Sequence, residues 1–121
     1  MLNYRIVIFP SKHIQDAANS HRMRYDPRYA LIPPHITLKE SFQADDHYIQ
    51  EIISELRKIA KDVKPFKINI NKISHFAPVT NTIYFKVEPT AELTELNERM
   101  HEGKFTKDRK HPFVPHITIA Q

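Results

Sequence analysis

The sequence predicts an α+β fold built from one β-α-loop-β unit that occurs twice. Two observations carry this prediction. Segments with strand, helix and loop patterns follow one another in the same order near both ends of the chain, and each copy closes on the tetrapeptide Pro-His-Ile-Thr, at residues 34–37 and again at 115–118. An internal repeat of this kind predicts two lobes related by a pseudo-twofold axis.

The first copy begins with an apolar, β-branched segment, Tyr4–Pro10, which predicts a buried strand. Ser11 can cap a helix that runs to about Arg24. Prolines predict a loop over Asp26–Pro34. From His35 onward the residues alternate, which predicts a half-buried strand. One face of this strand would carry His35, Thr37, Lys39 and Ser41, and the other face Ile36, Leu38 and Phe42.

The middle of the chain predicts a helix and a strand. Asp45 and Asp46 suit the positive, N-terminal end of a helix. That helix would carry the clearest amphipathic stripe of the chain, made of Ile49, Ile52, Ile53, Leu56, Ile59 and Ala60. The alternation of apolar Phe66, Ile68 and Ile70 with polar residues predicts a strand over residues 66–71.

The second copy repeats the order of the first. A strand is predicted over Thr82–Glu88, and Thr90 can cap a short helix. A charged loop, Lys104–Pro112, then leads to a last strand, Val114–Ala120. The inward face of the short helix would consist of Leu93, Leu96 and Met100.

Length and composition limit the classes of function. A chain of 121 residues predicts a single domain, 1–121, with a first lobe over about 1–80 and a second over about 81–121. The absence of cysteine excludes a disulfide frame, a thiol nucleophile and a zinc–thiolate site. Gly103 is the only glycine, which excludes a P-loop and a dinucleotide fingerprint, so phosphate would have to be bound by side chains. The net charge of +4 mildly favours anionic partners.

The sequence shows no address to another compartment. No apolar run approaches the roughly 18 residues of a membrane span, and residues 1–10 lack the shape of a signal peptide. We therefore expect a cytoplasmic protein without a membrane partner.

The duplicated triplet His-x-Thr is the chemical signal of the sequence. Eight histidines and seven threonines give an expectation of about 0.5 such triplets by chance, so one copy alone would mean little. Two copies that close matching units are far less expected. Residues i and i+2 share one face of a strand, so each triplet places an imidazole beside a hydroxyl. The motif residues on the opposite face, Ile36, Leu38, Ile117 and Ile119, would anchor it in the core.

Two imidazoles at one cleft suit the chemistry of phosphodiesters. One can be neutral and accept a proton from the nucleophile, while the other is charged and donates to the leaving oxygen. The hydroxyls of Thr37 and Thr118 can donate to the non-bridging oxygens. Lys39 shares the predicted face of His35 and could contact the substrate, although a solvated lysine is the more common interpretation of such a position. Its counterpart in the second copy is Ala120, so the two half-sites should differ.

These triplets resemble those of the two-histidine (2H) phosphoesterase superfamily, which includes cyclic phosphodiesterases and RNA 2′–5′ ligase-like enzymes. The resemblance covers essentially the whole chain and is strongest to the YjcG-type phosphoesterases of bacteria. It rests also on the segments Ile-Phe-Pro-Ser at 8–11, Arg-Tyr-Asp-Pro at 24–27, Leu-Ile-Pro-Pro-His at 31–35, Phe-Ala-Pro-Val at 76–79 and Phe-Val-Pro-His at 113–116.

The resemblance implies a bilobal α+β fold with antiparallel sheets flanked by helices. It implies catalysis without a metal or other cofactor at His35, Thr37, His116 and Thr118, with His35 as the proton donor and His116 as the proton acceptor. The substrate would be a cyclic phosphate or phosphodiester of a nucleotide or an RNA end. Members of the family continue well past the second triplet, so we expect an incomplete second lobe with an exposed apolar face around Ile117 and Ile119, and self-association through it.

Alternatives remain at this stage. The same cleft could serve a non-catalytic RNA- or nucleotide-binding module, or the repeat could be architectural only. A basic patch for RNA could form from Lys12, Arg22, Arg24 and Arg28, which could equally be the polar face of a helix and its loop. The other histidines lack a paired context and predict surface or structural roles: His13, His21, His47, His75, His101 and His111.

Overall fold

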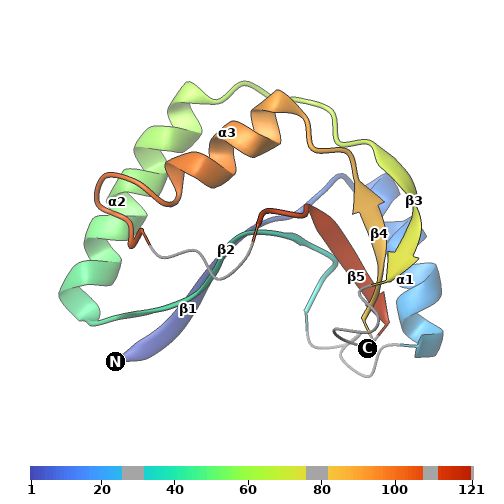
Figure 1. Cartoon of the computed structure of the whole chain (residues 1–121). Coiled ribbons are helices and arrows are strands. Elements are labelled where there is room, and N and C mark those ends of the chain that lie inside the picture. The colour runs from blue at the N-terminus through green and yellow to red at the C-terminus, as the bar shows by residue number, and fades with distance from the viewer. Residues whose placement is uncertain (26–31, 76–81, 108–111, 121) are drawn as a thin grey trace. The chain divides into compact units, whose positions relative to one another are not determined.

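The computed structural model describes residues 1–25, 32–75, 82–107 and 112–120, with three helices and five strands in those ranges (Figure 1). In chain order the elements are β1 (Leu2–Ile8), α1 (Lys12–Tyr25), β2 (Ile36–Ala44), α2 (Asp46–Asp62), β3 (Ile70–His75), β4 (Ile83–Val87), α3 (Ala91–Arg99) and β5 (His116–Ala120).

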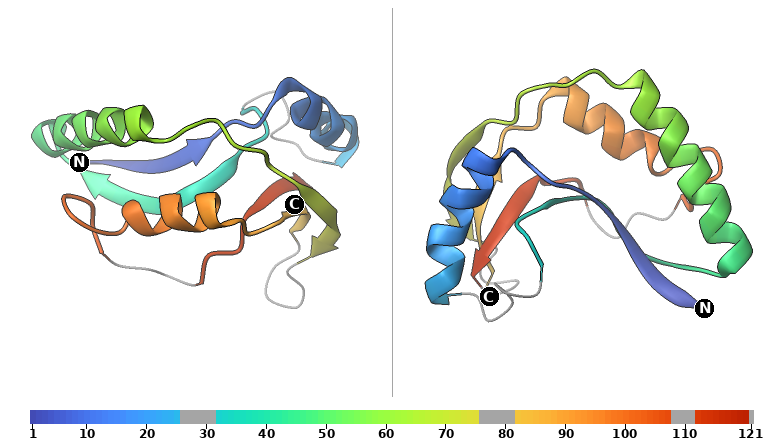
Figure 2. Two further views of the ribbon diagram at one scale, coloured as in Figure 1. Left: turned by 90° about the horizontal axis from the view of Figure 1, so that it is seen from above. Right: turned by 180° about the vertical axis from the view of Figure 1, so that it is seen from behind.

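The predicted repeat is present in the structure. The first copy is β1-α1-β2, and its two strands form a two-stranded sheet in which they run in opposite directions (Figure 2). The second copy is β4-α3-β5, and its strands also pair antiparallel. β3 joins β4 on the other side, which gives a second sheet of order β3-β4-β5. The α+β prediction with antiparallel sheets and flanking helices is therefore confirmed.

The described chain forms two compact units, each assembled from separate stretches. Unit 1 consists of Met1–Ile6, Leu38–Lys67 and Thr90–Phe113. Unit 2 consists of Val7–Thr37, Ile68–Pro89 and Val114–Gln121. The units are interleaved along the sequence, so neither coincides with the ranges 1–80 and 81–121, whose assignment to two lobes stays a prediction.

In unit 2, the register of the three-stranded sheet sorts its residues onto two faces. Phe85 of β4 lies opposite both Ile73 of β3 and Ile117 of β5. Cross-strand partners present their side chains on the same face, so these three residues define an apolar face. Helix α1 packs against β5, and the ring of its His21 lies 5.5 Å from the ring of Phe85 in a T-shaped contact. Helix α1 therefore covers the part of this face formed by Phe85 and Ile117, whereas Ile73 of β3 is 51% exposed.

This arrangement corrects the expectation of an exposed face on the second copy. Ile117 is fully buried and Ile119 is 3% exposed, because the helix of the first copy packs on the last strand of the second. The apolar residues on which the predicted self-association rested are thus covered within the chain. β5 lies at the edge of the described sheet.

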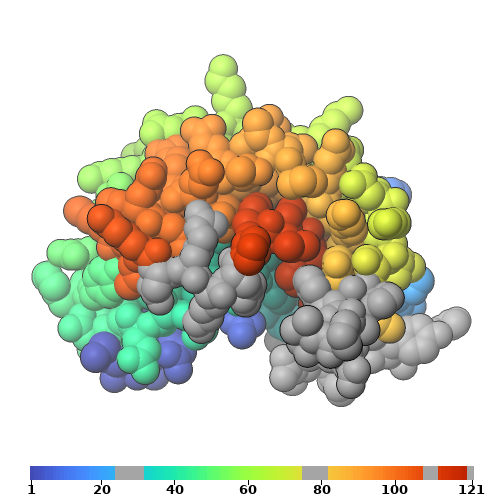
Figure 3. Space-filling model, in the orientation of Figure 1, coloured from blue at the N-terminus to red at the C-terminus, as the bar shows by residue number. Residues whose placement is uncertain are grey.

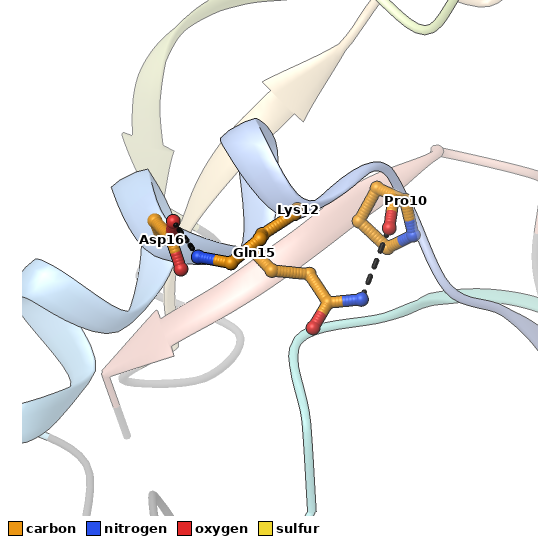
Figure 4. Close-up of polar contacts among 4 residues, drawn as sticks. All are labelled: Pro10, Lys12, Gln15 and Asp16. Carbon is orange, nitrogen blue, oxygen red and sulfur yellow. Dashed lines mark hydrogen bonds and ion pairs between the residues drawn. The ribbon is translucent and has the colours of Figure 1, made fainter.

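Local contacts explain where the helices begin. In α1, the side chain of Gln15 reaches back and donates to the carbonyl oxygen of Pro10, and Lys12 pairs with Asp16 one turn along (Figure 4). Asp45 caps α2 by accepting from the Tyr48 backbone N–H at 2.7 Å. Thr90 caps α3 in the same way through the Leu93 backbone N–H.

In unit 1, helices α2 and α3 bury their predicted apolar faces. Ile52 and Ile59 are the buried residues of α2, while the rest of the predicted stripe is half-buried except for the exposed Ala60. Leu93, Leu96 and Met100 are buried as predicted. Asn97 of α3 is also buried, and its side-chain amide donates to the carbonyl oxygen of Leu38 at 2.8 Å.

The bounds of several predicted strands were wrong by one or more residues, and two of them differ in a way that the structure explains. The strand predicted over 66–71 begins only at Ile70, because its ladder with β4 starts with the pair Ile70 and Val87. The first strand starts earlier than predicted, at Leu2, and Ile6 is its only buried residue. Residues 26–31 and 108–111 of the two predicted loops lie outside the described residues, as does the segment 76–81 between β3 and β4. Among the residues described, no helix has the length and apolar character needed to cross a bilayer.

Candidate functional site

The two His-x-Thr triplets occupy equivalent positions at the beginnings of two strands. His35 lies directly before β2 and Thr37 within it, while His116 is the first residue of β5 and Thr118 follows on the same face. All four side chains are half-buried. The intervening motif residues are buried, as the alternation predicted: Ile36, Leu38, Ile117 and Ile119.

All four triplet residues belong to unit 2, so the first triplet shares a compact unit with the sheet that carries the second. The chain segment that leads into β5 reaches the surface (red in Figure 3), in keeping with the 40% exposure of Val114. That the two imidazoles face one bound phosphate stays a prediction.

The two histidines make the same local contact. Nδ1 of His35 lies 2.9 Å from the carbonyl oxygen of Pro33, and Nδ1 of His116 lies 2.6 Å from the carbonyl oxygen of Val114. A carbonyl oxygen can only accept, so Nδ1 carries the hydrogen in both rings. In the neutral form Nε2 then holds the lone pair, which leaves Nε2 as the nitrogen able to accept a proton. In each triplet, the orientation of the histidine ring is therefore fixed by the carbonyl oxygen of the residue two positions before it.

Helix α1 holds the segment that carries the first of these contacts. The guanidinium of Arg22 donates to the carbonyl oxygen of Ile32 and to the side chain of Asn19. Arg22 is 2% exposed, so it is not part of an exposed basic patch, and that alternative loses one of its four members. Arg22 instead fixes the backbone three residues before His35. The sequence pattern did not single out this role, because it depends on a contact ten residues along the chain.

Strand β4 adds neighbours to the second triplet that the sequence analysis missed. Tyr84 lies directly opposite Thr118, and Lys86 lies directly opposite His116. The ring of Tyr84 also contacts the ring of His116 at 5.1 Å, and Tyr84 is buried. The sequence does indicate that Tyr84 and Lys86 share one face of a strand, because they alternate with Phe85. Only the register of the folded sheet shows that their cross-strand partners are Thr118 and His116.

Lys39 departs from the expectation of a solvated side chain. It is 2% exposed, and its ammonium donates to the carbonyl oxygen of Thr106 at 2.7 Å and lies 5.7 Å from the centre of the Phe42 ring. The strict alternation of β2 ends here, since Leu38 and Lys39 are both buried. Lys39 belongs to unit 1 and the triplets to unit 2. Its contact with a substrate stays a prediction, whereas its structural contacts are observed.

Comparison with known proteins identifies the family. Residues 10–121 match the 2′-5′ RNA ligase superfamily. The chain is 65% identical over 120 residues, which are 99% of it and 71% of the relative, to a protein of Oceanobacillus iheyensis named "Putative phosphoesterase". Relatives of the same name in Bacillus cereus and Bacillus cytotoxicus are 59% and 60% identical over 116 residues, which are 96% of this chain and 67% of each relative. The chain belongs to the 2′-5′ RNA ligase superfamily of two-histidine phosphoesterases.

Membership in this superfamily confirms the resemblance drawn from the paired triplets. The remaining histidines of this superfamily member have other surroundings where they are described. His21 packs on Phe85, His101 contacts the carbonyl oxygen of Asn97, His47 lies 3.4 Å from Glu51, and His13 is exposed. His111 and the side chain of His75 lie outside the described residues. Within the described ranges, no three His, Cys, Asp or Glu side chains are grouped so that they could hold a metal ion.

Proposed function

We propose that this protein is a phosphoesterase that hydrolyses cyclic phosphates or phosphodiesters of nucleotides or RNA ends without a metal. The observation that supports the proposal best is the repeated contact of Nδ1 with the carbonyl oxygen two residues earlier, at 2.9 Å for His35 and 2.6 Å for His116. Histidines that serve only as surface residues need no such matched orientation. Histidines that exchange protons through Nε2 do need it.

In the proposed reaction, the two imidazoles start in opposite protonation states. Neutral His116 accepts a proton at Nε2 from a water molecule as the water oxygen forms a bond to phosphorus. Charged His35 donates its Nε2 proton to the leaving oxygen as the phosphorus–oxygen bond breaks. The assignment of donor and acceptor follows the family. The reaction consumes one water, and exchange with solvent restores both imidazoles.

The threonines contribute to the same step. As the water attacks, negative charge grows on the non-bridging oxygens of the phosphate. The hydroxyls of Thr37 and Thr118 stand two residues from each imidazole on the same strand face and can donate to these oxygens. The charged imidazole adds electrostatic stabilisation, so the proposal requires no divalent cation.

A substrate panel tests this function. The purified protein is incubated with 2′,3′-cyclic nucleotides, ADP-ribose cyclic phosphate and 2′–5′ linked oligonucleotides in the presence of a chelator. We expect turnover of at least one of these classes, and its loss in the His116→Asn variant. The matched control is His47→Ala, since His47 lies on α2 and pairs with Glu51. Binding of these compounds without turnover would overturn the proposal in favour of a nucleotide-binding module.

A further inference from the structure

Three residues that can carry positive charge form one row across the sheet of unit 2. Lys86 of β4 lies opposite Lys72 of β3 on one side and opposite His116 of β5 on the other. The register is regular through this row, because the shift in β3 falls before Lys72 and the shift in β4 falls before Tyr84. Neighbouring strands are about 4.8 Å apart, so the row spans roughly 10 Å.

The row lies on the same face as the second triplet. Tyr84 and Thr118 are direct partners two residues further along, which is the next row on the same face, and Ser74 lies opposite Tyr84 on β3. The contact between the rings of Tyr84 and His116 shows that these two side chains share a face. The apolar row of Phe85 and its partners points to the other face, where α1 packs on β5 and its His21 contacts Phe85. Both lysines therefore lie on one side of the proposed catalytic imidazole, on the polar face of the sheet, with Lys86 next to His116 and Lys72 beyond it.

The two lysines lie directly opposite each other, so a bound anion would stabilise their placement. Like charges directly opposite each other on paired strands destabilise a sheet. Among the described residues, neither ammonium pairs with a carboxylate; Glu88, which directly follows β4, accepts a hydrogen bond from Asn69. Lys86 is half-buried and Lys72 is exposed, so both can reach a ligand at the surface. A bound phosphate would offset their repulsion.

We propose that Lys86 and Lys72 form a subsite for a second phosphate group of the substrate. The inference rests on the proposed function and narrows its substrate class to nucleotides that carry at least two phosphates, such as an RNA end or a cyclic nucleotide that is also phosphorylated at its 5′ position. The scissile phosphate binds at the triplets, and the second phosphate binds along the row, on the side of His116 that faces β4. The lysines hold the substrate and take no part in proton transfer.

Binding measurements test the subsite separately from catalysis. By titration calorimetry, we compare adenosine 3′,5′-bisphosphate with adenosine 3′-monophosphate as ligands of the wild-type protein and of Lys86→Met and Lys72→Met. We expect the wild type to prefer the bisphosphate by roughly tenfold or more, since each charged hydrogen bond contributes on that scale. Lys86→Met should remove most of this preference and leave binding of the monophosphate nearly unchanged. Lys86→Arg should retain it.

The control removes a lysine charge away from the row. Lys12 lies on α1, where it pairs with Asp16, and Lys12→Met should change the affinity neither for the bisphosphate nor for the monophosphate. Equal affinity of the wild type for both nucleotides, or equal weakening of both by Lys86→Met, would overturn the subsite. The calorimetry measures binding alone, and the substrate panel measures turnover. A protein that prefers the bisphosphate in the first experiment but hydrolyses nothing in the second would refute the proposed function and leave the subsite in place.

Discussion

The ring of Tyr84 lies 5.1 Å from the ring of His116, at an interplanar angle of 62°. Tyr84 is also the cross-strand partner of Thr118, so one buried aromatic residue of β4 adjoins both the histidine and the threonine of the second triplet. Aromatic pairs in tilted and T-shaped arrangements stabilise each other by about 0.5–1.5 kcal/mol beyond the area that they bury. The orientation of the His116 ring thus depends on β4 as well as on the carbonyl oxygen of Val114.

Replacing Tyr84 should reduce turnover through the orientation of His116. Tyr84→Leu removes the ring and should lower kcat by about tenfold, with a loss of about 1–3 kcal/mol in the free energy of unfolding. Tyr84→Phe keeps the ring and should retain most of kcat. Steady-state kinetics and chemical denaturation of both variants provide the measurement. Equal kcat for the leucine and phenylalanine variants would contradict the supporting role of the ring.

Substitutions of the triplet histidines should distinguish the structural role of Nδ1 from the catalytic role of Nε2. Alanine at His35 or His116 should lower kcat/KM by about 10²–10⁴-fold. Asparagine at either position can still donate to the neighbouring carbonyl oxygen but lacks Nε2, so it should lose as much activity while melting close to the wild type. Thr37→Ala and Thr118→Ala should cost up to about 10²–10³-fold. An asparagine variant with near-normal turnover would exclude proton transfer through Nε2.

The rate should depend on pH as a bell, without dependence on divalent metals. One imidazole must be charged and the other neutral, so kcat/KM should fall at acid pH, where both are charged, and at alkaline pH, where both are neutral. A pH series in the presence and absence of a chelator measures this. A strict requirement for a divalent metal, or a rate that rises steadily with pH, would contradict the paired mechanism.

Lys39→Met distinguishes a structural lysine from one that binds substrate. The variant keeps the apolar stem beside Phe42 but leaves the carbonyl oxygen of Thr106 without its donor. We expect a loss of about 1–3 kcal/mol in stability and an unchanged KM for the folded protein. Thermal melts and kinetics well below the melting temperature provide the two readouts. A raised KM at unchanged stability would instead assign Lys39 to substrate binding.

Much of the fold could be predicted because its signals are local. The caps Asp45 and Thr90 lie within three residues of the N–H groups that they bind, so both helices begin where the sequence indicates. The start of β3 was not accessible in this way, because pairing with Val87 decides it. Burial of Lys39 depends on Thr106, 67 residues away. Packing of α1 on β5 joins the two copies of the repeat, and no pattern within either copy indicates that contact.

The residues of the candidate site likewise fall into those that a local sequence pattern indicates and those that depend on contacts in the folded chain. The two triplets could be found because each is a short motif and the motif is duplicated. Arg22, Tyr84 and Lys86 could not, because each acts through a partner that only the folded chain brings near: a carbonyl oxygen on the segment before β2, an imidazole on the next strand, and a facing row of the sheet.

The interleaving of the two units has a consequence for dissecting the protein. The chain crosses between them after Ile6, Thr37, Lys67, Pro89 and Phe113. Any continuous fragment that contains one complete unit also contains most of the other, so neither unit can be produced alone by shortening the chain at its ends. Two of the crossings adjoin the triplets, one directly after Thr37 and one three residues before His116. Melting of unit 1 would release the chain beside both, and activity should therefore disappear in the same denaturant transition as the fold.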